Sequence, residues 1–203
     1  MLLRRRARLA LTDYVNAIDV PGRPVSDDAE ETRFAPAETT LAAHHWLLLK
    51  ALQRAMDTPG GRLMVFMPPG SAKSTYASVV APSWWLGQEP NRQIILTSCA
   101  TDLAKRHGRR TRQIANSAKF RALFATELSA ESAAADEWAL TNGSEYMAGG
   151  LLSGLTGNRA GGVIIDDPVA GREEAESETI RRKTYEAYQD DLLSRLKPHG
   201  WVV

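Results

Sequence analysis

Three short, continuous apolar runs, each broken by a turn and followed by a helical pattern, most constrain how this chain can fold. They cover residues 62–67, 93–98 and 163–165. A run of four to eight apolar residues bounded by turn signals is typical of a strand buried on both faces, as in a parallel sheet. We therefore predict an α/β domain with a mainly parallel central sheet flanked by helices.

The segments around these runs supply the expected helices and one hairpin. Apolar residues recur at three- to four-residue spacing in four stretches, so we expect helices at 39–56, 73–80, 101–115 and 177–197. The second of these should stop near Pro82. Asn142-Gly143 between two short runs predicts a β-hairpin, and residues 201–203 resemble the first step of a further strand.

Length and composition limit the remaining possibilities. The chain has 203 residues, a formal charge of +1 and one cysteine, Cys99. We expect a compact domain at 33–203, preceded by an N-terminal helix and linker at 1–32. Disulfides and cysteine-based zinc sites are not expected, and no apolar run is long enough to span a membrane. The arginines near the N-terminus favour a solvated surface helix over contact with DNA or a membrane. These features indicate a soluble protein of a reducing compartment.

The turn after the first apolar run carries the first chemical signal. Backbone N–H groups at a helix N-terminus bind phosphate, a lysine adds positive charge, and a hydroxyl contributes to a Mg²⁺ site. The segment that offers these groups comprises Pro69, Gly70, Ser71, Ala72, Lys73, Ser74 and Thr75. The strict phosphate-loop pattern has glycine at positions 67 and 72, so this segment by itself also fits a helix cap after a proline turn.

Two carboxylates at the end of the third apolar run carry the second signal. Asp166 would hold Mg²⁺ together with Ser74, and Asp167 would orient or deprotonate an attacking water as a catalytic residue. An aspartate pair before Pro168 also ends many ordinary strands. In combination with Lys73, the order of these elements predicts an ATPase of the P-loop class that binds ATP and Mg²⁺.

A positive group commonly stabilises the charge that develops on a transferred phosphoryl group. Arg159, just before the third apolar run, is the first candidate for this catalytic role, from the same or a neighbouring subunit. Arg109, Arg110 and Arg112 are alternatives. Each of these arginines also fits a solvated or DNA-facing side chain.

Three further features leave alternatives open. The basic helix at 101–115 fits the phosphates of duplex DNA and an ordinary exposed face equally well. The histidines His44 and His45, with Trp46, could border an adenine ring, but packing of their helix onto the sheet is favoured. Six glycines at 149–162 precede a strand rather than a helix, which predicts a mobile loop and not a second phosphate site.

Several of these motifs together resemble the ATPase portion of the large terminase subunits of tailed phages and prophages. The resemblance covers His44-His45 and the runs at 62–78, 102–110, 155–160, 164–169 and 188–198. That family tolerates a variant phosphate loop. The resemblance implies a three-layer P-loop NTPase of the ASCE type that couples Mg-ATP hydrolysis to translocation of double-stranded DNA into a prohead.

The resemblance also implies partners and marks a departure. Family members work with a small terminase subunit and a portal, as a homo-oligomeric ring when assembled, in the cytoplasm of the bacterial host. The coupling segment of the family would follow Val203, and its nuclease domain is not in this sequence. We therefore expect no nuclease activity from this chain and an ATPase sheet that lacks its last strand, which would leave an open edge.

Two other functional classes fit parts of the pattern. The chain could be a different P-loop enzyme, such as a helicase-type translocase, which would separate strands, or a small-molecule kinase, which would need an acceptor pocket. It could also be a truncated terminase remnant without catalysis. Retained nucleotide or DNA binding without ATP turnover would indicate that case.

Overall fold

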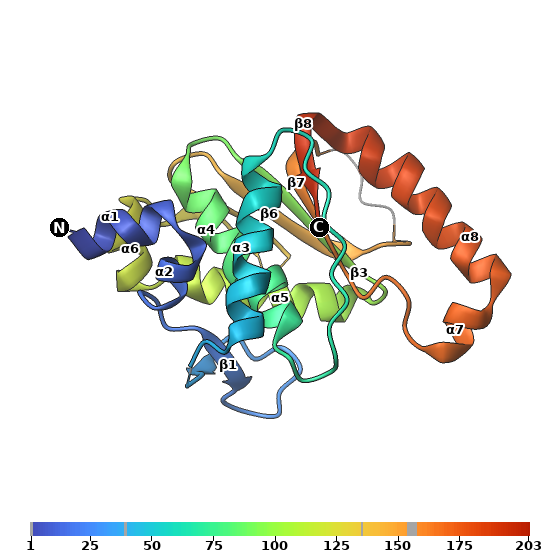
Figure 1. The fold of residues 1–203 in the computed structure, drawn as a ribbon, viewed down its shortest axis with the longest axis horizontal. Coiled ribbons are helices and arrows are strands. Elements are labelled where there is room, and N and C mark those ends of the chain that lie inside the picture. Colours follow the sequence, from blue (N-terminus) through green and yellow to red (C-terminus); the bar gives the residue numbers. More distant parts are fainter. Residues whose placement is uncertain (1, 39, 135, 154–157) are drawn as a thin grey trace.

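The computed structural model describes residues 2–38, 40–134, 136–153 and 158–203 and shows a mixed α/β fold. Within these ranges, a six-stranded main sheet contains β4 (Leu128–Ala133), β5 (Glu137–Leu140), β6 (Glu145–Gly150), β3 (Gln93–Ser98), β7 (Ala160–Asp166) and β8 (Leu196–Val202), in that spatial order. The four strands from β6 to β8 are parallel, and β4 and β5 are antiparallel additions. The predicted α/β class with a mainly parallel sheet is confirmed (Figure 1).

Parallel register brings the ends of three strands together at one edge of the sheet. Ser98, the last residue of β3, pairs with Asp166 on one side and with Gly150 on the other. Side chains just beyond these strands therefore gather at the carboxyl edge, where open α/β sheets bind their ligands. The predicted hairpin is also confirmed, because β5 and β6 pair on either side of a turn in which Gly143 has a φ of 81°.

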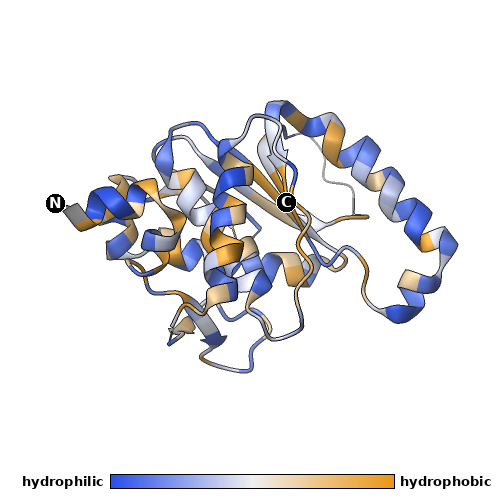
Figure 2. Ribbon diagram, in the orientation of Figure 1, coloured by the Kyte–Doolittle hydropathy of each residue, from blue (hydrophilic) through white to orange (hydrophobic). Residues whose placement is uncertain are grey.

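Helices cover both faces of the sheet, because successive side chains along each strand point to opposite faces and both faces are apolar. Ile94 and Leu96 of β3 belong to the main core, whereas Ile95 belongs to a smaller core on the opposite face. The main core is covered by α3 (Ala43–Asp57), the π-helix η1 (Thr75–Val80), α4 (Ala81–Gln88), α5 (Thr101–Ala115) and α6 (Ala118–Phe124). The smaller core is closed by the C-terminal part of the arm formed by α7 (Arg172–Glu176), α8 (Glu178–Ala187), η2 (Tyr188–Leu192) and η3 (Leu193–Arg195). Figure 2 shows that this arm is largely hydrophilic, in contrast to the central strands.

Two predicted helix ends are wrong. The helix after the phosphate-loop segment does not stop at Pro82, because η1 passes directly into α4. The proline lies at this junction, where Ala81 N–H bonds to the carbonyl of Tyr76, five residues back, in the wider π-helical pattern. The helix expected at 177–197 leaves regular α geometry after Ala187, and Pro198 lies within β8. The strand expected at 201–203 is confirmed as the end of β8.

The N-terminal segment contributes to the main core. It forms α1 (Leu2–Leu9), α2 (Leu11–Val15) and a small antiparallel pair of β1 (Pro21–Pro24) and β2 (Phe34–Pro36). Leu11 and Tyr14 are fully buried, and the Tyr14 hydroxyl lies 2.9 Å from Ser83 Oγ. Trp84 Nε1 donates to the carbonyl of Ala7 at 3.1 Å. The prediction of a surface helix therefore holds only for the arginine side of α1, and the domain boundary near residue 33 stays a prediction.

The first apolar run departs most from expectation. Residues 62–67 were predicted as a buried strand, but among the described residues they pair with the sheet only at their start, where Arg62 bridges to Val202 and Leu63 N donates to Val202 O at 3.0 Å. Met64 and Phe66 are 78% and 86% exposed. These contacts join the run to β8, which lies between it and β7. A cavity of about 1200 Å³ separates the rest of the run from β7.

Candidate functional site

The phosphate-loop segment forms a tight turn between residue 67 and η1. Gly70 has a φ of 78° and Ala72 a φ of 60°, both in the left-handed region. Ser71 closes the turn, because its backbone N–H and its Oγ both donate to the carbonyl of Pro68, at 3.2 and 2.6 Å. Ala72 thus has the conformation that the glycine of the strict pattern adopts without strain. The loop keeps the turn although its sequence lacks that glycine.

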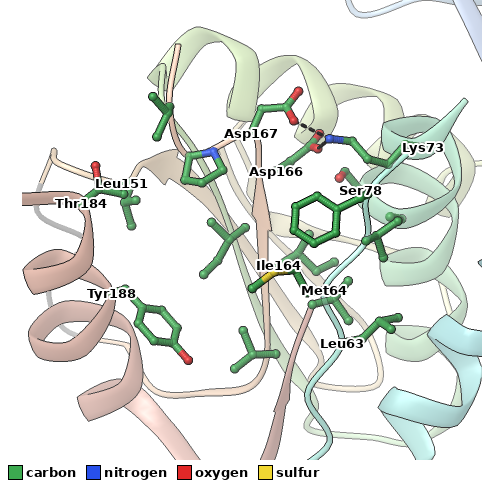
Figure 3. A pocket seen from close by; sticks show the side chains of 18 of the residues that line it. Leu63, Met64, Lys73, Ser78, Leu151, Ile164, Asp166, Asp167, Thr184 and Tyr188 are labelled. Carbon is green, nitrogen blue, oxygen red and sulfur yellow. Dashed lines mark hydrogen bonds and ion pairs between the residues drawn. The ribbon is translucent and has the colours of Figure 1, made fainter. Parts of the chain in front are cut away.

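The structure brings Lys73, Ser74, Asp166 and Asp167 together, as the sequence predicted; Figure 3 shows Lys73 with the two aspartates. Lys73 Nζ forms an ion pair with Asp167 Oδ1 and lies 3.6 Å from Asp166 Oδ1. Ser74 Oγ donates to the same Asp166 oxygen at 3.1 Å. The loop supplies the first two residues and the end of β7 the other two, so a hydroxyl, an ammonium group and two carboxylates converge at the carboxyl edge of the sheet.

Both members of the Lys73–Asp166 contact are held in their charged forms. Burial acts to lower the pKa of Lys73, but the hydrogen bond that Lys73 donates to Asp167 and the charges of both carboxylates outweigh it and raise that pKa. Burial acts to raise the pKa of Asp166, but His107, Ser74 and Lys73 outweigh it and lower that pKa. At neutral pH this contact therefore joins the Lys73 ammonium cation to the Asp166 carboxylate anion.

The backbone at Asp167 turns sharply out of the sheet. Its φ is 47°, a conformation that aspartate tolerates better than most residues. Its carbonyl accepts a hydrogen bond from Cys99 N at 3.1 Å, which ties this turn to the end of β3. The Asp167 side chain is about half exposed and extends toward Lys73 (Figure 3). Asp166, by contrast, is 4% exposed.

His107 is a member of this cluster that the motif analysis missed. It lies on α5, is 4% exposed, and its Nε2 is 3.0 Å from Asp166 Oδ2. The spacing of apolar residues places this side chain on the inward face of its helix, and a histidine on such a face needs a polar partner. That signal is present in the sequence, but it does not say which residue the partner is.

Arg159 does not join the cluster within this chain. It immediately precedes β7, whereas Asp166 ends that strand, so the two residues are separated by the strand's length, about 20 Å at 3.3 Å per residue. Arg62 and Arg181 both border the same cavity as Lys73 and Asp167. The Arg62 guanidinium is bound to backbone carbonyls, those of Gly60, Gly61 and Gly200, so the candidate from this cavity is Arg181 of α8. Sequence reasoning missed it, since it lies in a charged segment that resembles any solvated helix.

The basic residues of α5 are largely occupied by contacts within the chain. Arg109 is 5% exposed, and its guanidinium contacts Glu30 at 3.0 Å and the carbonyl of Ala29 at 2.7 Å. Arg110 donates to the carbonyl of Pro21 and to Thr75 Oγ1, the latter at 3.2 Å. These two side chains thus fasten the N-terminal segment to α5 and to the start of η1, and Arg109 is not part of an exposed DNA-facing surface.

The histidines that precede the phosphate loop lie beside it. The His45 ring lies 4.9 Å from the ring of Tyr76 on η1, between centroids, and 4.0 Å from that of His44. Burial and the neighbouring His44 lower the pKa of His45. This geometry agrees with the favoured packing interpretation for His45. Trp46 is 37% exposed, and contact with adenine stays a prediction.

The glycines at 149–162 are in part strand residues, so the predicted mobile loop is wrong for the described ones. Gly149 and Gly150 end β6, and Gly161 and Gly162 lie in β7. Cβ atoms at the last two would lie 2.9 Å from Trp85 and 2.2 Å from Trp201, so close packing of these rings explains both glycines. Residues 154–157, which include part of the run at 155–160, lie outside the described residues.

The donor set limits which metal the cluster could hold. Among the described residues no group of three or more His, Cys, Asp or Glu side chains is placed to bind a metal ion by itself. Ser74 and Asp166 offer two oxygens, which fits Mg²⁺, an ion that usually keeps several waters and takes other ligands from substrate phosphates.

Comparisons with known proteins agree with the resemblance. Residues 64–202, most of the chain, match the family model described as "Terminase large subunit, T4likevirus-type, N-terminal". The search of curated proteins gives no match. No helix in the described part of the chain has the length and apolar character that a bilayer crossing requires.

Proposed function

The chain belongs to the terminase large subunits, as an N-terminal portion, and on that premise we propose that it is the ATPase part of a viral DNA-packaging motor. The family indicates a component of phage DNA packaging. Hydrolysis of ATP, and its coupling to translocation of double-stranded DNA, are the finer steps that we propose. The observation that carries the proposal is the convergence of Lys73 and Ser74 with Asp166 and Asp167.

Each of the four residues has a distinct proposed role. Lys73 binds the β- and γ-phosphates, and the loop at 69–75 surrounds them with backbone N–H groups. Ser74 and Asp166 offer oxygens to Mg²⁺, and Asp167 holds or deprotonates the attacking water. When bound, ATP supplies the phosphoryl group and Mg²⁺ neutralises part of its charge. The fold that we propose for this chemistry is a P-loop NTPase of the ASCE type.

The residues present fit this nucleotide and metal. Ser74 Oγ and Asp166 Oδ1 are already 3.1 Å apart, so one ion can bind both oxygens after a small adjustment. Lys73 is held charged beside them. Gly70 and Ala72 give the turn its left-handed residues, which lets successive N–H groups of the loop face one side.

The assembled motor supplies the proposed partners. By family, these are double-stranded DNA, a small terminase subunit, and the portal of a prohead, with several copies of the chain in a ring in the host cytoplasm. In such a ring Arg159 could approach the site of a neighbouring subunit, which is the role left to it by its distance from Asp166. Arg181 is the corresponding candidate within one chain.

Nucleotide binding by Lys73→Ala tests the proposal directly. Calorimetric titration with Mg-ATP should show binding by the wild-type chain and at least tenfold weaker binding by the variant, because the main positive contact to the phosphates is lost. Lys119→Ala is the matched control, since Lys119 is an exposed lysine paired with Asp19 far from the site along the chain. Equal binding by wild type and Lys73→Ala, in folded protein, would sink the assignment.

ATP turnover, measured with duplex DNA present, distinguishes a working ATPase from a chain that binds nucleotide without hydrolysing it. Turnover that is lost in Lys73→Ala supports a working ATPase. Binding that depends on Lys73 but is followed by no turnover supports a nucleotide-binding terminase portion without catalysis.

A further inference from the structure

Asp166 uses its two carboxylate oxygens for different neighbours. Oδ1 accepts from Ser74 Oγ at 3.1 Å and lies 3.6 Å from Lys73 Nζ. Oδ2 lies 3.0 Å from His107 Nε2; the two atoms are close but not aligned for a hydrogen bond, and neither makes one with another described residue. Only Oδ1 therefore belongs to the oxygens that we assign to Mg²⁺, while the other oxygen lies against a buried ring.

His107 is itself held in place by its helix. Thr111, one turn further along α5, donates from Oγ1 to the carbonyl of His107 at 2.9 Å and lies 3.3 Å from the carbonyl of Val79 in η1. The segment that carries Ser74 continues into η1, so α5 is fastened to the same element that delivers the loop. Histidine and loop thus share one rigid support.

We propose that His107 is a positioning residue that fixes the rotation of the Asp166 carboxylate, so that Oδ1 faces Ser74 and the metal ion that these two residues hold. The proposal rests on the proposed function, since it concerns the same Mg²⁺ site. With its hydrogen on Nε2, the ring needs only a small rotation to donate to Oδ2, and that bond would remove the freedom of the carboxylate to turn this oxygen toward the site.

Groups that support a metal ligand from behind have a measurable effect on the metal. Removing such a partner commonly costs about 10- to 100-fold in metal affinity. A histidine that only fills space would, on removal, change the stability of the fold without changing the concentration of Mg²⁺ that the site needs. The dependence of nucleotide binding on Mg²⁺ therefore distinguishes positioning from packing.

The experiment measures binding of a non-hydrolysable ATP analogue at increasing Mg²⁺, and again in EDTA, with the fold checked by circular dichroism. His107→Leu replaces the ring with an apolar side chain of similar size that has no hydrogen-bond donor. His107→Gln has an N–H donor near the position of Nε2. Ile114→Val is the matched control on the same helix, because it trims a buried side chain of α5 and leaves both His107 and Thr111 unchanged.

We expect His107→Leu to raise the half-saturating Mg²⁺ concentration about 10- to 100-fold and to leave binding in EDTA within about twofold of wild type. His107→Gln should recover most of the loss, and Ile114→Val should behave as wild type. Where His107→Leu does not fold, His107→Asn takes its place, since the shorter amide cannot reach Oδ2. An unchanged Mg²⁺ requirement in a folded donor-free variant overturns the inference.

The same data separate this inference from the proposed function. If the wild-type chain binds the analogue in a Lys73-dependent manner but His107→Leu keeps the same Mg²⁺ requirement, the inference fails and the function stands. If the wild-type chain shows no nucleotide binding with or without Mg²⁺, the function fails and the inference with it.

Discussion

Lys73 and Asp167 form an ion pair between two segments that are 94 residues apart in the sequence. In this pair, the ammonium group that we propose to bind the nucleotide phosphates contacts the carboxylate that we propose to hold or deprotonate the attacking water. A nucleotide must therefore compete with Asp167 for Lys73. The two proposed roles are coupled, because phosphate binding to Lys73 releases Asp167 for its own task.

Asp167→Asn separates binding from hydrolysis. The amide loses the negative charge that competes for Lys73, so Mg-ATP binding should be retained or several-fold tighter. Turnover should fall by about 100-fold or more, because loss of a general base commonly costs 10²–10⁴ in rate. Calorimetry and a phosphate-release assay on the same protein check both halves. Loss of binding with an intact fold would instead indicate that Asp167 holds the metal.

Ala72→Gly should stabilise the chain. At a φ of 60° the Ala72 side chain carries a left-handed penalty of about 1–2 kcal/mol, of which glycine's greater freedom in the unfolded chain cancels a part. We expect a net gain of about 0.5–1 kcal/mol in the free energy of unfolding, measured by urea denaturation. Ala51→Gly, in the middle of α3, is the control and should lose about 1 kcal/mol. A loss at residue 72 as well would contradict the strain argument.

The site could be predicted where it depends on local pattern and strand direction. Asp166 ends an apolar run that is a strand, and parallel strands bring such ends to one edge. Lys73 follows the first apolar run by a turn and reaches the same edge, although that run is not a strand of the sheet. The same rule, applied to Arg159, places it at the opposite edge because it precedes its strand. His107 could not be assigned in this way, since its helix face is visible in the sequence but the residue opposite it is not.

The run at 62–67 shows why a strand pattern does not ensure a strand. Its apolar residues fit a buried strand, yet a strand also needs a neighbour to pair with, and among the described residues the run pairs with β8 only at Arg62 and Leu63. Which strand lies beside a run depends on tertiary contacts that the composition of the run does not contain. The mobile-loop prediction for 149–162 failed for a related reason. Gly161 and Gly162 pack closely against Trp85 and Trp201, which are distant in the sequence and leave no room for a Cβ atom.

Gly162→Ala should destabilise the contact between β7 and β8. A Cβ at this position would lie 2.2 Å from the Trp201 ring, which is 2% exposed and packs edge-on against Trp85 at 5.2 Å between centroids. Because the ring has little room to move, we expect a loss of about 1–3 kcal/mol, the usual cost of overpacking. In a Trp201→Phe background the smaller ring should reduce this loss, and equal losses in both backgrounds would contradict the proposed clash.

Asp166→Asn should change how stability depends on acid. The pKa of Asp166 is lowered in the fold, so its charged form adds stability that is complete above the unfolded value of about 3.9 and is lost as the pH falls through the folded value. The variant cannot take up this proton. It should be less stable than wild type at neutral pH, and the two free energies of unfolding should converge below pH 4.

Urea denaturation between pH 2 and pH 7, with EDTA present so that no metal ion contributes, measures this convergence. Uptake of one proton changes the slope of the free energy of unfolding against pH by at most about 1.4 kcal/mol per pH unit. This value is the upper limit for the difference in slope between the wild-type and variant curves. Repeating the series at high salt should leave most of the difference in place, because Asp166 is buried among His107, Ser74 and Lys73 and is poorly screened. Curves that stay parallel below pH 4 would show that these neighbours do not favour the charged carboxylate.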